Sequence, residues 1–345
     1  MTNSIASHFS AWPMAALALG VLLTISGRAH GQASANEAPV LLSVSKIWDQ
    51  GRHNAFTDLI RFNGTWYCAF REGDGHVGGD GQARILASGD GASWESVALL
   101  GQAGVDLRDP KLSITADGRL MAVMGGSYYD GKELLNRKPH VAFSADGREW
   151  SAPQKVESLP DGDWLWRVTW HEGRAYGVTY NIFVDEGADW VLRLVTSPDG
   201  LDWEPVATLD VPGRPNETTV RFLADGRMLL LVRREGGNTR GWIGVSDAPY
   251  TGWTWHETAY RLGGPNFIPL PDGSLWAGSR NVAGPATCVL ARFGVDTYEP
   301  ALTLPSGGDC SYPGLVWHDG KLCMSYYSSH EGKTSIYLAT IRLPE

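Results

Sequence analysis

The sequence of 345 residues is poor in several features that would place it in other classes of protein. Only 4 residues are cysteine, and neither a Cys-x-x-Cys pair nor a histidine cluster is present, so we expect neither a metal site nor a cofactor. Lysine and arginine number 29 against 38 acidic residues, which gives a formal net charge of −9 without a basic run. Nucleic acid is therefore not an expected partner.

The sequence also lacks an apolar run long enough to span a bilayer near its N-terminus. The run Met14–Ile25 (MAALALGVLLTI) has the length of a signal-peptide core, and Ala29-His30-Gly31 is a small-x-small cleavage site. We interpret residues 1–31 as a signal peptide and 32–39 as a disordered lead. The protein is then secreted or periplasmic, with no stable membrane span after signal removal. Because residues 1–13 contain no Lys or Arg, a lipid-facing N-terminal anchor is the alternative.

Export permits disulfide bonds, and the four cysteines are even in number. Cys68 and Cys323 lie in apolar strand patterns, where a thiol packs as a small hydrophobic group. Cys288 and Cys310 are therefore the more plausible pair, although the sequence leaves the pairing open.

Glycine is abundant, with 42 residues, and six glycines close hairpin turns between apolar, β-rich runs. They are Gly64, Gly118, Gly173, Gly226, Gly273 and Gly320, with spacings of 54, 55, 53, 47 and 47 residues. Such a period carried by strands alone predicts an all-β fold, a six-bladed β-propeller of four-stranded antiparallel sheets, over residues 40–345. We expect Leu41–Trp48 to pair with Thr334–Leu343 and close the ring.

A second motif, Ser-x-Asp-x-Gly-x-x-Trp or a close variant, marks another turn in several repeats. It occurs as SGDGASW (88–94), SADGREW (144–150) and SPDGLDW (197–203), with a stretched form starting at Ser246. Aspartate accepts hydrogen bonds from the backbone of its own turn, and tryptophan packs between sheets. We therefore interpret these "Asp boxes" as structural turns without a catalytic role.

In a propeller, the inner strands converge on a central pit, so charged residues at the ends of the hairpin arms are candidates for a site. They include Arg71, Glu72, Arg108, Asp109, Arg167, Glu217, Arg233, Arg234, Arg280 and Tyr312. Arginine dominates this set, which is typical of a site that holds a carboxylate or sulfate group.

Over nearly its whole mature length, the chain resembles the sialidase (neuraminidase) superfamily. The stretch NETTVRFLADG…LVRR is similar to the family's fourth-blade motif and matches Glu217 and Arg233 to its Glu and ligand-binding Arg. The stretch DCSYPGLVWHDGKL is similar to the nucleophile strand and matches Tyr312. By the same resemblance, Arg280 in SRN is the other arginine of the later blades.

The stretch CAFREGDGHVGGDGQARI resembles the segment that carries the family's acid/base aspartate. Its position before the return strand matches Asp80, with Asp74 as the competitor. Residues 73–81 contain five glycines, so this loop can move over a bound ligand.

The resemblance implies an exported glycoside hydrolase, similar to an exo-α-sialidase, that removes a terminal acidic sugar from a glycan. Tyr312 would be the nucleophile, activated by Glu217, and Asp80 the acid/base; sialidases with a Tyr nucleophile are exceptions to the two-carboxylate scheme. A neutral phenol can approach an anomeric carbon that bears a carboxylate, whereas a carboxylate nucleophile would be repelled. The residues expected to bind the substrate are Arg233, Arg280, Arg71, Arg108, Asp109 and Arg167.

One family feature is missing. The family opens its first blade with an Arg-Ile-Pro motif whose Arg binds the substrate carboxylate, whereas here the stretch reads HNAFTDLI, with Ala55 near the matching place. Arg52, Arg71 or Arg108 could replace it. The alternatives are a glycosidase for another acidic or sulfated sugar and a non-catalytic glycan-binding propeller.

The spacings also predict the geometry of the pit. Tyr312 lies eight residues before Gly320, and Glu217 nine before Gly226, so both open the first arm of a hairpin. Their side chains are expected at the same end of the ring and within hydrogen-bond reach of each other. We further expect Arg233 and Arg280 to point into one cavity with Tyr312.

Overall fold

The computed structural model describes residues 37–79 and 81–344. The predicted signal peptide, most of the predicted lead, and Asp80 lie outside the described residues. The described residues contain 24 β-strands and no helix that could cross a membrane.

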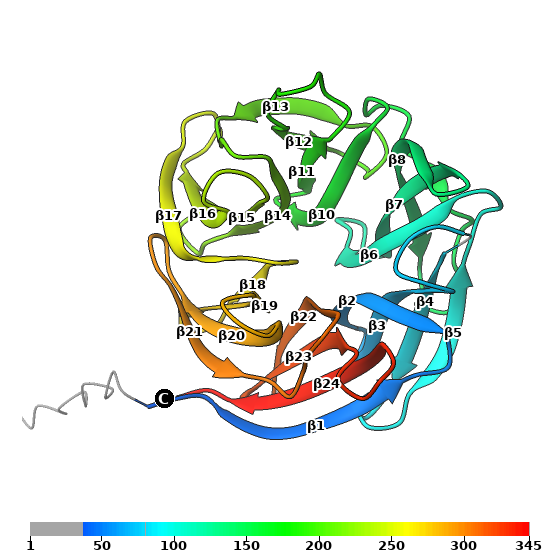
Figure 1. Cartoon of the computed structure of the whole chain (residues 1–345). Coiled ribbons are helices and arrows are strands. Elements are labelled where there is room, and N and C mark those ends of the chain that lie inside the picture. The colour runs from blue at the N-terminus through cyan, green and yellow to red at the C-terminus, as the bar shows by residue number, and fades with distance from the viewer. Residues whose placement is uncertain (1–36, 80, 345) are drawn as a thin grey trace, which may run out of the picture. The chain divides into compact units, whose positions relative to one another are not determined.

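The strands form six antiparallel sheets of four strands each, which are the six predicted blades (Figure 1). The first three blades are β2 (His53–Phe62), β3 (Thr65–Gly73), β4 (Gln82–Ser88) and β5 (Glu95–Leu100); β6 (Asp106–Ile114), β7 (Leu120–Asp130), β8 (Glu133–Ser144) and β9 (Gln154–Lys155); and β10 (Asp163–His171), β11 (Arg174–Asn181), β12 (Val191–Ser197) and β13 (Glu204–Leu209).

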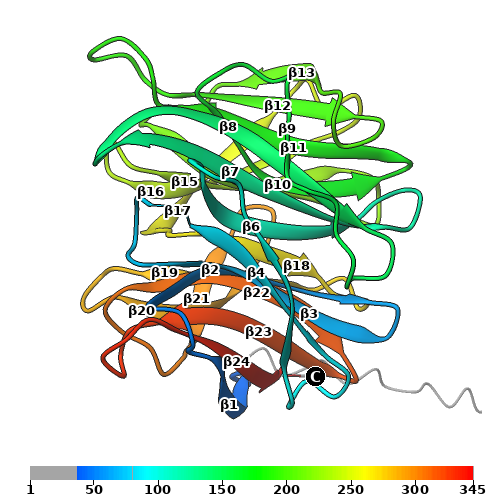
Figure 2. The same ribbon diagram turned by 90° about the vertical axis from the view of Figure 1, so that its right-hand side faces the viewer.

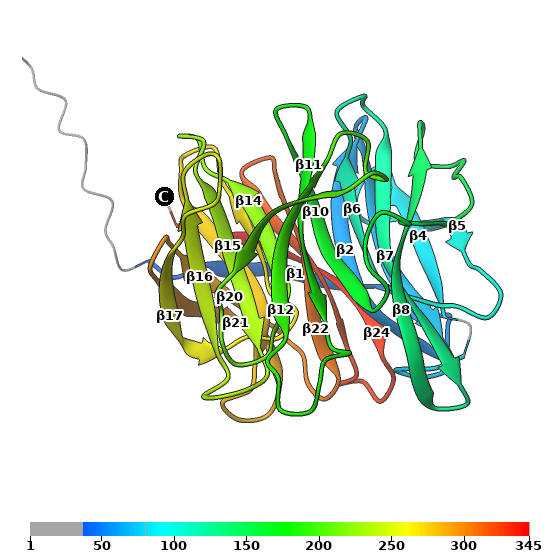
Figure 3. The same cartoon turned by 90° about the horizontal axis from the view of Figure 1, so that it is seen from above.

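The last three blades are β14 (Pro215–Phe222), β15 (Met228–Arg234), β16 (Arg240–Ser246) and β17 (Thr254–Arg261); β18 (Asn266–Pro269), β19 (Leu275–Asn281), β20 (Thr287–Phe293) and β21 (Tyr298–Thr303); and β22 (Cys310–His318), β23 (Lys321–Ser328), β24 (Ser335–Arg342) and β1 (Val40–Trp48). The first strand of each blade in this order (β2, β6, β10, β14, β18 and β22) lies innermost, around the centre of the ring (Figure 1). The sheets are twisted and stack face to face around this centre (Figures 2 and 3).

The ring closes as predicted. Strand β1 pairs antiparallel with β24, from Val40 opposite Arg342 to Trp48 opposite Ile336, and becomes the outermost strand of the sixth blade. The N-terminal strand and the C-terminal hairpin therefore share one sheet, which leaves the ring without an open seam between its first and last elements.

The Asp boxes are structural turns, as expected. In each of the three regular copies, the Asp side chain accepts hydrogen bonds from two backbone N–H groups of its own turn, and the Trp indole N–H donates to the carbonyl of the turn glycine. These bonds hold the outer turns and leave the pit to other residues.

Five of the six innermost strands carry a break in register near the start of the strand. The breaks fall between Ala55 and Asp58, Arg108 and Lys111, Leu165 and Val168, Pro215 and Thr218, and Ser311 and Gly314. Bulges of this kind re-aim side chains out of the regular alternation. Three residues within them, Phe56, Asp109 and Tyr312, have left-handed φ angles of 67°, 49° and 55°.

The cysteines remain free thiols. All four are buried, and the expected bridge between Cys288 and Cys310 is not formed in this structure. Cys288 lies on β20 in the fifth blade and Cys310 on β22 in the sixth.

Candidate active site

A cavity of about 260 Å³ opens where the innermost strands of several blades meet. Blades two, three, four and six and the β3–β4 loop line it, with Val77, Arg108, Asp109, Tyr129, Arg137, Trp164, Tyr180, Ile182, Trp190, Asn216, Glu217, Arg233 and Tyr312. Tyr312, Glu217, Arg233, Arg108 and Asp109, all predicted from the sequence, thus meet at one cavity.

Tyr312 and Glu217 are in direct contact, as their similar offsets from the turn glycines indicated. The Tyr312 hydroxyl donates to Glu217 Oε1 at 2.6 Å. Arg233 Nη1 donates to Glu217 Oε2 at 2.7 Å and to the Tyr312 hydroxyl at 3.2 Å. Gly264 N–H donates to Glu217 Oε2 at 3.0 Å, so the carboxylate is held from three sides.

The electrostatics of this contact keep the tyrosine neutral and the glutamate charged. Burial, followed by the charge of Glu217, raises the pKa of Tyr312 well above its ordinary value. Burial alone would raise the pKa of Glu217, but the charge of Arg233 and the hydrogen bond from Tyr312 outweigh it and lower that pKa. At neutral pH, a phenol therefore faces a carboxylate that can accept its proton.

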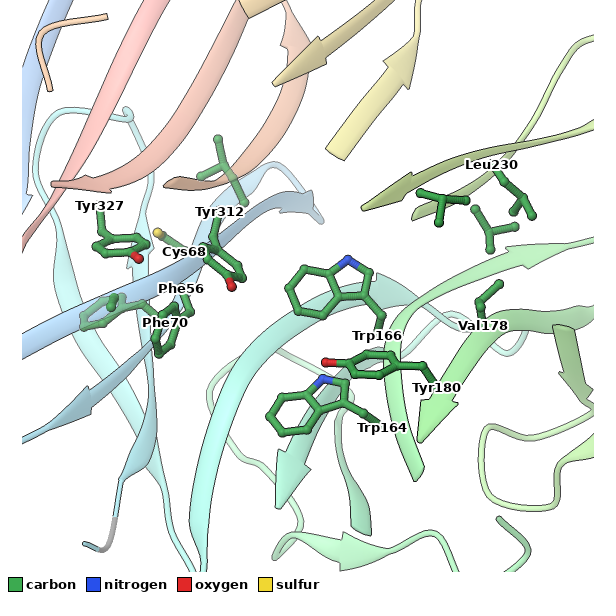
Figure 4. Close-up of a cluster of buried hydrophobic side chains, with 14 of the residues drawn as sticks. Phe56, Cys68, Phe70, Trp164, Trp166, Val178, Tyr180, Leu230, Tyr312 and Tyr327 are labelled. Atoms are coloured by element: carbon green, nitrogen blue, oxygen red, sulfur yellow. The ribbon is translucent and has the colours of Figure 1, made fainter. Parts of the chain in front are cut away.

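The Tyr312 ring is held by aromatic neighbours (Figure 4). Its centroid lies 5.0 Å from Phe56, 5.5 Å from Trp166 and 5.9 Å from Tyr327. A Cβ on Gly264, whose φ is +58°, would lie 2.8 Å from the ring, so this close approach requires glycine. The nucleophile candidate is thus fixed by packing as well as by hydrogen bonds.

Lys111 is a site component that the sequence reasoning missed. It is 1% exposed, donates to the carbonyl of Thr57 at 3.1 Å, and places Nζ 5.4 Å from the centroid of the Tyr312 ring. Burial, followed by repulsion from Arg167, lowers its pKa to about 8 against the attraction of Asp109 and Asp58. Lys111 follows two charged residues in the stretch RDPK, and nothing in that stretch signals that the lysine is buried.

Arg108 and Asp109 are consecutive residues at the bulge of β6 and face the cavity. The Arg108 guanidinium lies 5.1 Å from the Phe56 ring centroid. Asp109 is 6% exposed, and its Oδ1 is buried without a hydrogen-bond partner among the described residues. Burial raises the pKa of Asp109, against the lowering effects of Arg108 and Lys111.

Two predicted substrate-binding arginines, Arg71 and Arg167, are not among the described residues that line this cavity. Arg71 is fully buried and donates to Asp106 Oδ1 at 2.7 Å and to the carbonyls of Gly75 and Gly78. Arg167 is 3% exposed, and its Nη1 donates to both carboxylate oxygens of Asp58, at 2.9 and 2.8 Å. Each guanidinium thus binds an internal partner, and a role of Arg71 or Arg167 in substrate binding stays a prediction.

The prediction that Arg280 points into one cavity with Tyr312 stays a prediction. Its side chain is half-buried, Nη1 donates to the carbonyl of Cys310 at 3.3 Å, and it is not among the described residues that line the cavity. Its charge also helps to lower the pKa of Glu217. Of the two arginines expected beside Tyr312, only Arg233 lines the cavity.

The rival acid and the rival arginine in the first blade lie on the surface. The Asp74 and Arg52 side chains are 87% and 81% exposed and are 3.7 Å apart. Of the other two residues that could replace the missing arginine, Arg71 lies directly opposite Ala55 on β3, and Arg108 lies over the ring of Phe56 and lines the cavity.

The sequence reasoning also missed the aromatic wall of the cavity. Trp164 and Tyr180 stack with centroids 6.4 Å apart, and the Arg137 guanidinium lies 5.0 Å from the Trp164 ring centroid. The tryptophans of DWLWRVTW in β10 were a usable signal, since aromatic side chains next to polar groups are typical of small-molecule sites.

Solved structures with the same fold are known. One is a protein of unknown function from Dyadobacter fermentans, with a TM-score of 0.78 and 20% identity over 89% of this chain and 99% of that one. Another is the α-L-arabinofuranosidase of Fusarium graminearum, with a TM-score of 0.70 and 14% identity over 88% and 99%.

The sialidase of Trypanosoma rangeli matches with a TM-score of 0.67 and 11% identity, over 88% of this chain and 59% of that one. No protein-family model and no curated protein matches the sequence. The chain is thus a six-bladed propeller whose structural neighbours include a sialidase and an arabinofuranosidase, and the expected resemblance to sialidases is confirmed at the level of the fold.

Proposed function

We propose that the protein is an exported glycoside hydrolase that removes a terminal acidic sugar with retention of configuration. The observation that carries this proposal is the contact of Tyr312, Glu217 and Arg233 at the wall of one cavity. A buried phenol bound to a buried carboxylate has the arrangement of an activated nucleophile and its base.

The chemistry takes two steps. The Tyr312 oxygen bonds to the anomeric carbon while its proton passes to Glu217 Oε1, and the bond to the leaving oxygen breaks as an acid protonates it. Water then attacks the glycosyl-tyrosine, gives up a proton to the deprotonated acid, and releases the sugar; Glu217 returns its proton to the phenolate. Arg233 neutralises the carboxylate and contacts the tyrosine oxygen, where charge develops.

Asp80 is the acid in this proposal, as the sequence indicated, and Asp109 is the second candidate that the structure adds. Asp109 lines the cavity, has an unpartnered buried oxygen among the described residues, and has a raised pKa, three properties that suit a proton donor near neutral pH.

An acidic sugar is favoured by the arginines of the cavity that have spare donors. The two terminal nitrogens of Arg233 are occupied, because they bind Glu217, the Tyr312 hydroxyl and Glu235. Arg108 and Arg137 also line the cavity, and the Nε of each, like that of Arg233, is buried without a partner among the described residues. Two guanidinium groups at one cavity suit a carboxylate or sulfate.

A panel of fluorogenic aryl glycosides tests this function. It contains sialosides, uronides, sulfated sugars and neutral arabinofuranosides, assayed with the wild type, Glu217→Gln, Arg108→Met and Arg137→Met. We expect hydrolysis of an acidic sugar, a loss of at least about 10³-fold in Glu217→Gln, and a higher KM in one or both arginine variants.

Hydrolysis of neutral sugars alone would refute the acidic substrate. Glycan binding without hydrolysis of any glycoside would refute the enzyme proposal and favour a non-catalytic glycan-binding propeller.

A further inference from the structure

Two histidines and an aspartate gather beside the cavity, although they are far apart in the sequence. His53 opens β2, His76 lies in the β3–β4 loop, and Asp309 directly precedes β22. His53 Nε2 lies 3.2 Å from Asp309 Oδ2, and His76 Nδ1 lies 2.8 Å from the same oxygen. One ligand atom from each residue lies within 4.8 Å of the others.

We propose that His53, His76 and Asp309 form a binding site for a divalent transition-metal ion, with Zn²⁺ as the preferred ion. Two imidazole nitrogens and one carboxylate oxygen are a common donor set for zinc. Zinc binds such ligands at about 2.0–2.2 Å, so that neighbouring ligand atoms in a tetrahedral site lie about 3.3–3.6 Å apart. Small side-chain adjustments bring the observed group to that geometry.

The aspartate is already oriented for this role. Its Oδ1 accepts a hydrogen bond from the Tyr327 hydroxyl at 2.8 Å, which turns Oδ2 toward the two imidazoles. Its backbone N–H donates to Ser329 Oγ at 2.8 Å. Hydrogen bonds that fix a ligating carboxylate are a regular part of metal sites and contribute to their affinity.

Exposure also fits an ion that enters from solvent. The His76 side chain is 49% exposed and Asp309 is 29% exposed, whereas His53 is 12% exposed. Three protein ligands leave a fourth position for water, which distinguishes this group from a closed structural site.

The ion would fasten the β3–β4 loop to the sixth blade. His76 and its neighbour Val77 belong to this loop, and Val77 lines the cavity. The His76 ring also packs against Phe56, with centroids 5.1 Å apart, and Phe56 packs against Tyr312. Metal binding would therefore hold one wall of the cavity in place.

The test is metal titration of the purified, EDTA-treated protein, by calorimetry with Zn²⁺ and by visible absorbance with Co²⁺. We expect one saturable site in the micromolar range or tighter and a higher Tm with zinc. His76→Ala and Asp309→Asn should each weaken binding by at least about 10-fold. His76 lies in a loop and is half-exposed, so His76→Ala is expected to fold; a thermal melt checks this.

His318→Ala is the matched control, because His318 on β22 also faces an aspartate, Asp319 at 3.2 Å, but no second histidine among the described residues. It should bind zinc as the wild type does. The absence of saturable binding below about 100 μM in the wild type, or equal binding in the wild type and His76→Ala, would overturn the proposal. These readouts do not depend on glycosidase activity.

Discussion

Replacing Tyr312 by phenylalanine removes one oxygen and keeps the ring. That oxygen donates to Glu217 Oε1 at 2.6 Å and accepts from Arg233 Nη1 at 3.2 Å. The ring contacts with Phe56 and Trp166 are unchanged in the variant. Any effect on turnover therefore reports on the hydroxyl group and not on repacking.

The cost in stability can be bounded from these contacts. A hydrogen bond to a charged group contributes about 1.5–3 kcal/mol, so Tyr312→Phe should lower the free energy of unfolding by about that amount. In the variant, Glu217 Oε2 keeps its hydrogen bonds from Arg233 and the Gly264 N–H, while Oε1 loses the only partner it has among the described residues; because the Oε2 contacts are kept, the variant should still fold. Loss of the nucleophile should reduce kcat by at least about 10⁴-fold, equal to about 5.4 kcal/mol, with ligand affinity within about threefold.

The assay measures kcat and KM on the best substrate of the glycoside panel, glycan affinity by calorimetry, and stability in urea. Tyr326→Phe is the matched control, because Tyr326 is also buried and loses a single hydrogen bond, to the carbonyl of Pro305 at 2.9 Å. It should lose about 0.5–1.5 kcal/mol of stability and keep wild-type turnover.

More than about 1% of wild-type kcat in Tyr312→Phe would refute the tyrosine mechanism, because a nucleophile cannot be removed at so small a cost. In the wild type, rapid quenching and mass spectrometry of the peptide that contains Tyr312 should detect the attached sugar. An adduct on any other residue would refute the assignment.

Two further predictions concern other cavity groups. If Asp109 is the acid, Asp109→Asn should slow the hydrolysis of alkyl glycosides by at least about 10²-fold and that of activated aryl glycosides far less. Asp80→Asn should then affect both classes of glycoside equally. The reverse pattern would show that Asp80 is the acid. The pKa of Lys111 is about 8 in the folded protein, against an ordinary 10.5. Below pH 8 the buried lysine carries its charge and lowers the free energy of unfolding by the full amount. Between pH 8 and 10.5 only the unfolded chain keeps the proton, so this loss of stability becomes smaller as the pH rises. We therefore measure the free energy of unfolding in urea from pH 7.5 to 9.5 for the wild type and Lys111→Met. The wild type should gain up to about 1.4 kcal/mol per pH unit relative to the variant. A difference between the two proteins that does not change with pH would contradict this.

The six-bladed ring could be predicted from the sequence because the turns between its strands are marked by local residues. A turn glycine such as Gly226 or Gly320 takes a positive φ that other residues rarely adopt, here 86° and 68°, and so marks its hairpin directly. Similar offsets from these glycines also placed Tyr312 and Glu217 at one end of the ring. The position of a residue could therefore be predicted where it depends only on the number of residues between it and a turn glycine.

The partners of the charged side chains near the centre of the ring could not be predicted in the same way. Arg71 and Arg167 lie within β3 and β10, and their guanidinium groups bind Asp106 and Asp58, which are 35 and 109 residues away. His53 and His76 meet Asp309 only because the last blade closes beside the first. Partners that depend on ring closure leave no local pattern in the sequence.

The bulges of the inner strands are a feature that the sequence analysis did not predict. Regular alternation would assign each inner-strand residue to a face, but the breaks in register turn Asp109 and Tyr312 out of that alternation. A usable signal was present, because a proline comes directly after both residues, at Pro110 and Pro313. Proline cannot donate to a sheet, so inside a strand it is typical of a bulge.

The positions of Arg108 and Arg137 narrow the choice among acidic sugars. A sialic acid carries its carboxylate on the anomeric carbon, next to the nucleophile, whereas a uronic acid carries it across the ring. Arg108 packs over Phe56, which also packs against Tyr312, so a single ring separates Arg108 from the proposed nucleophile. Arg137 lies on the aromatic wall over Trp164 instead. Within the glycoside panel, a larger rise in KM for Arg108→Met than for Arg137→Met therefore indicates a carboxylate at the anomeric carbon, and the opposite order indicates one across the sugar ring.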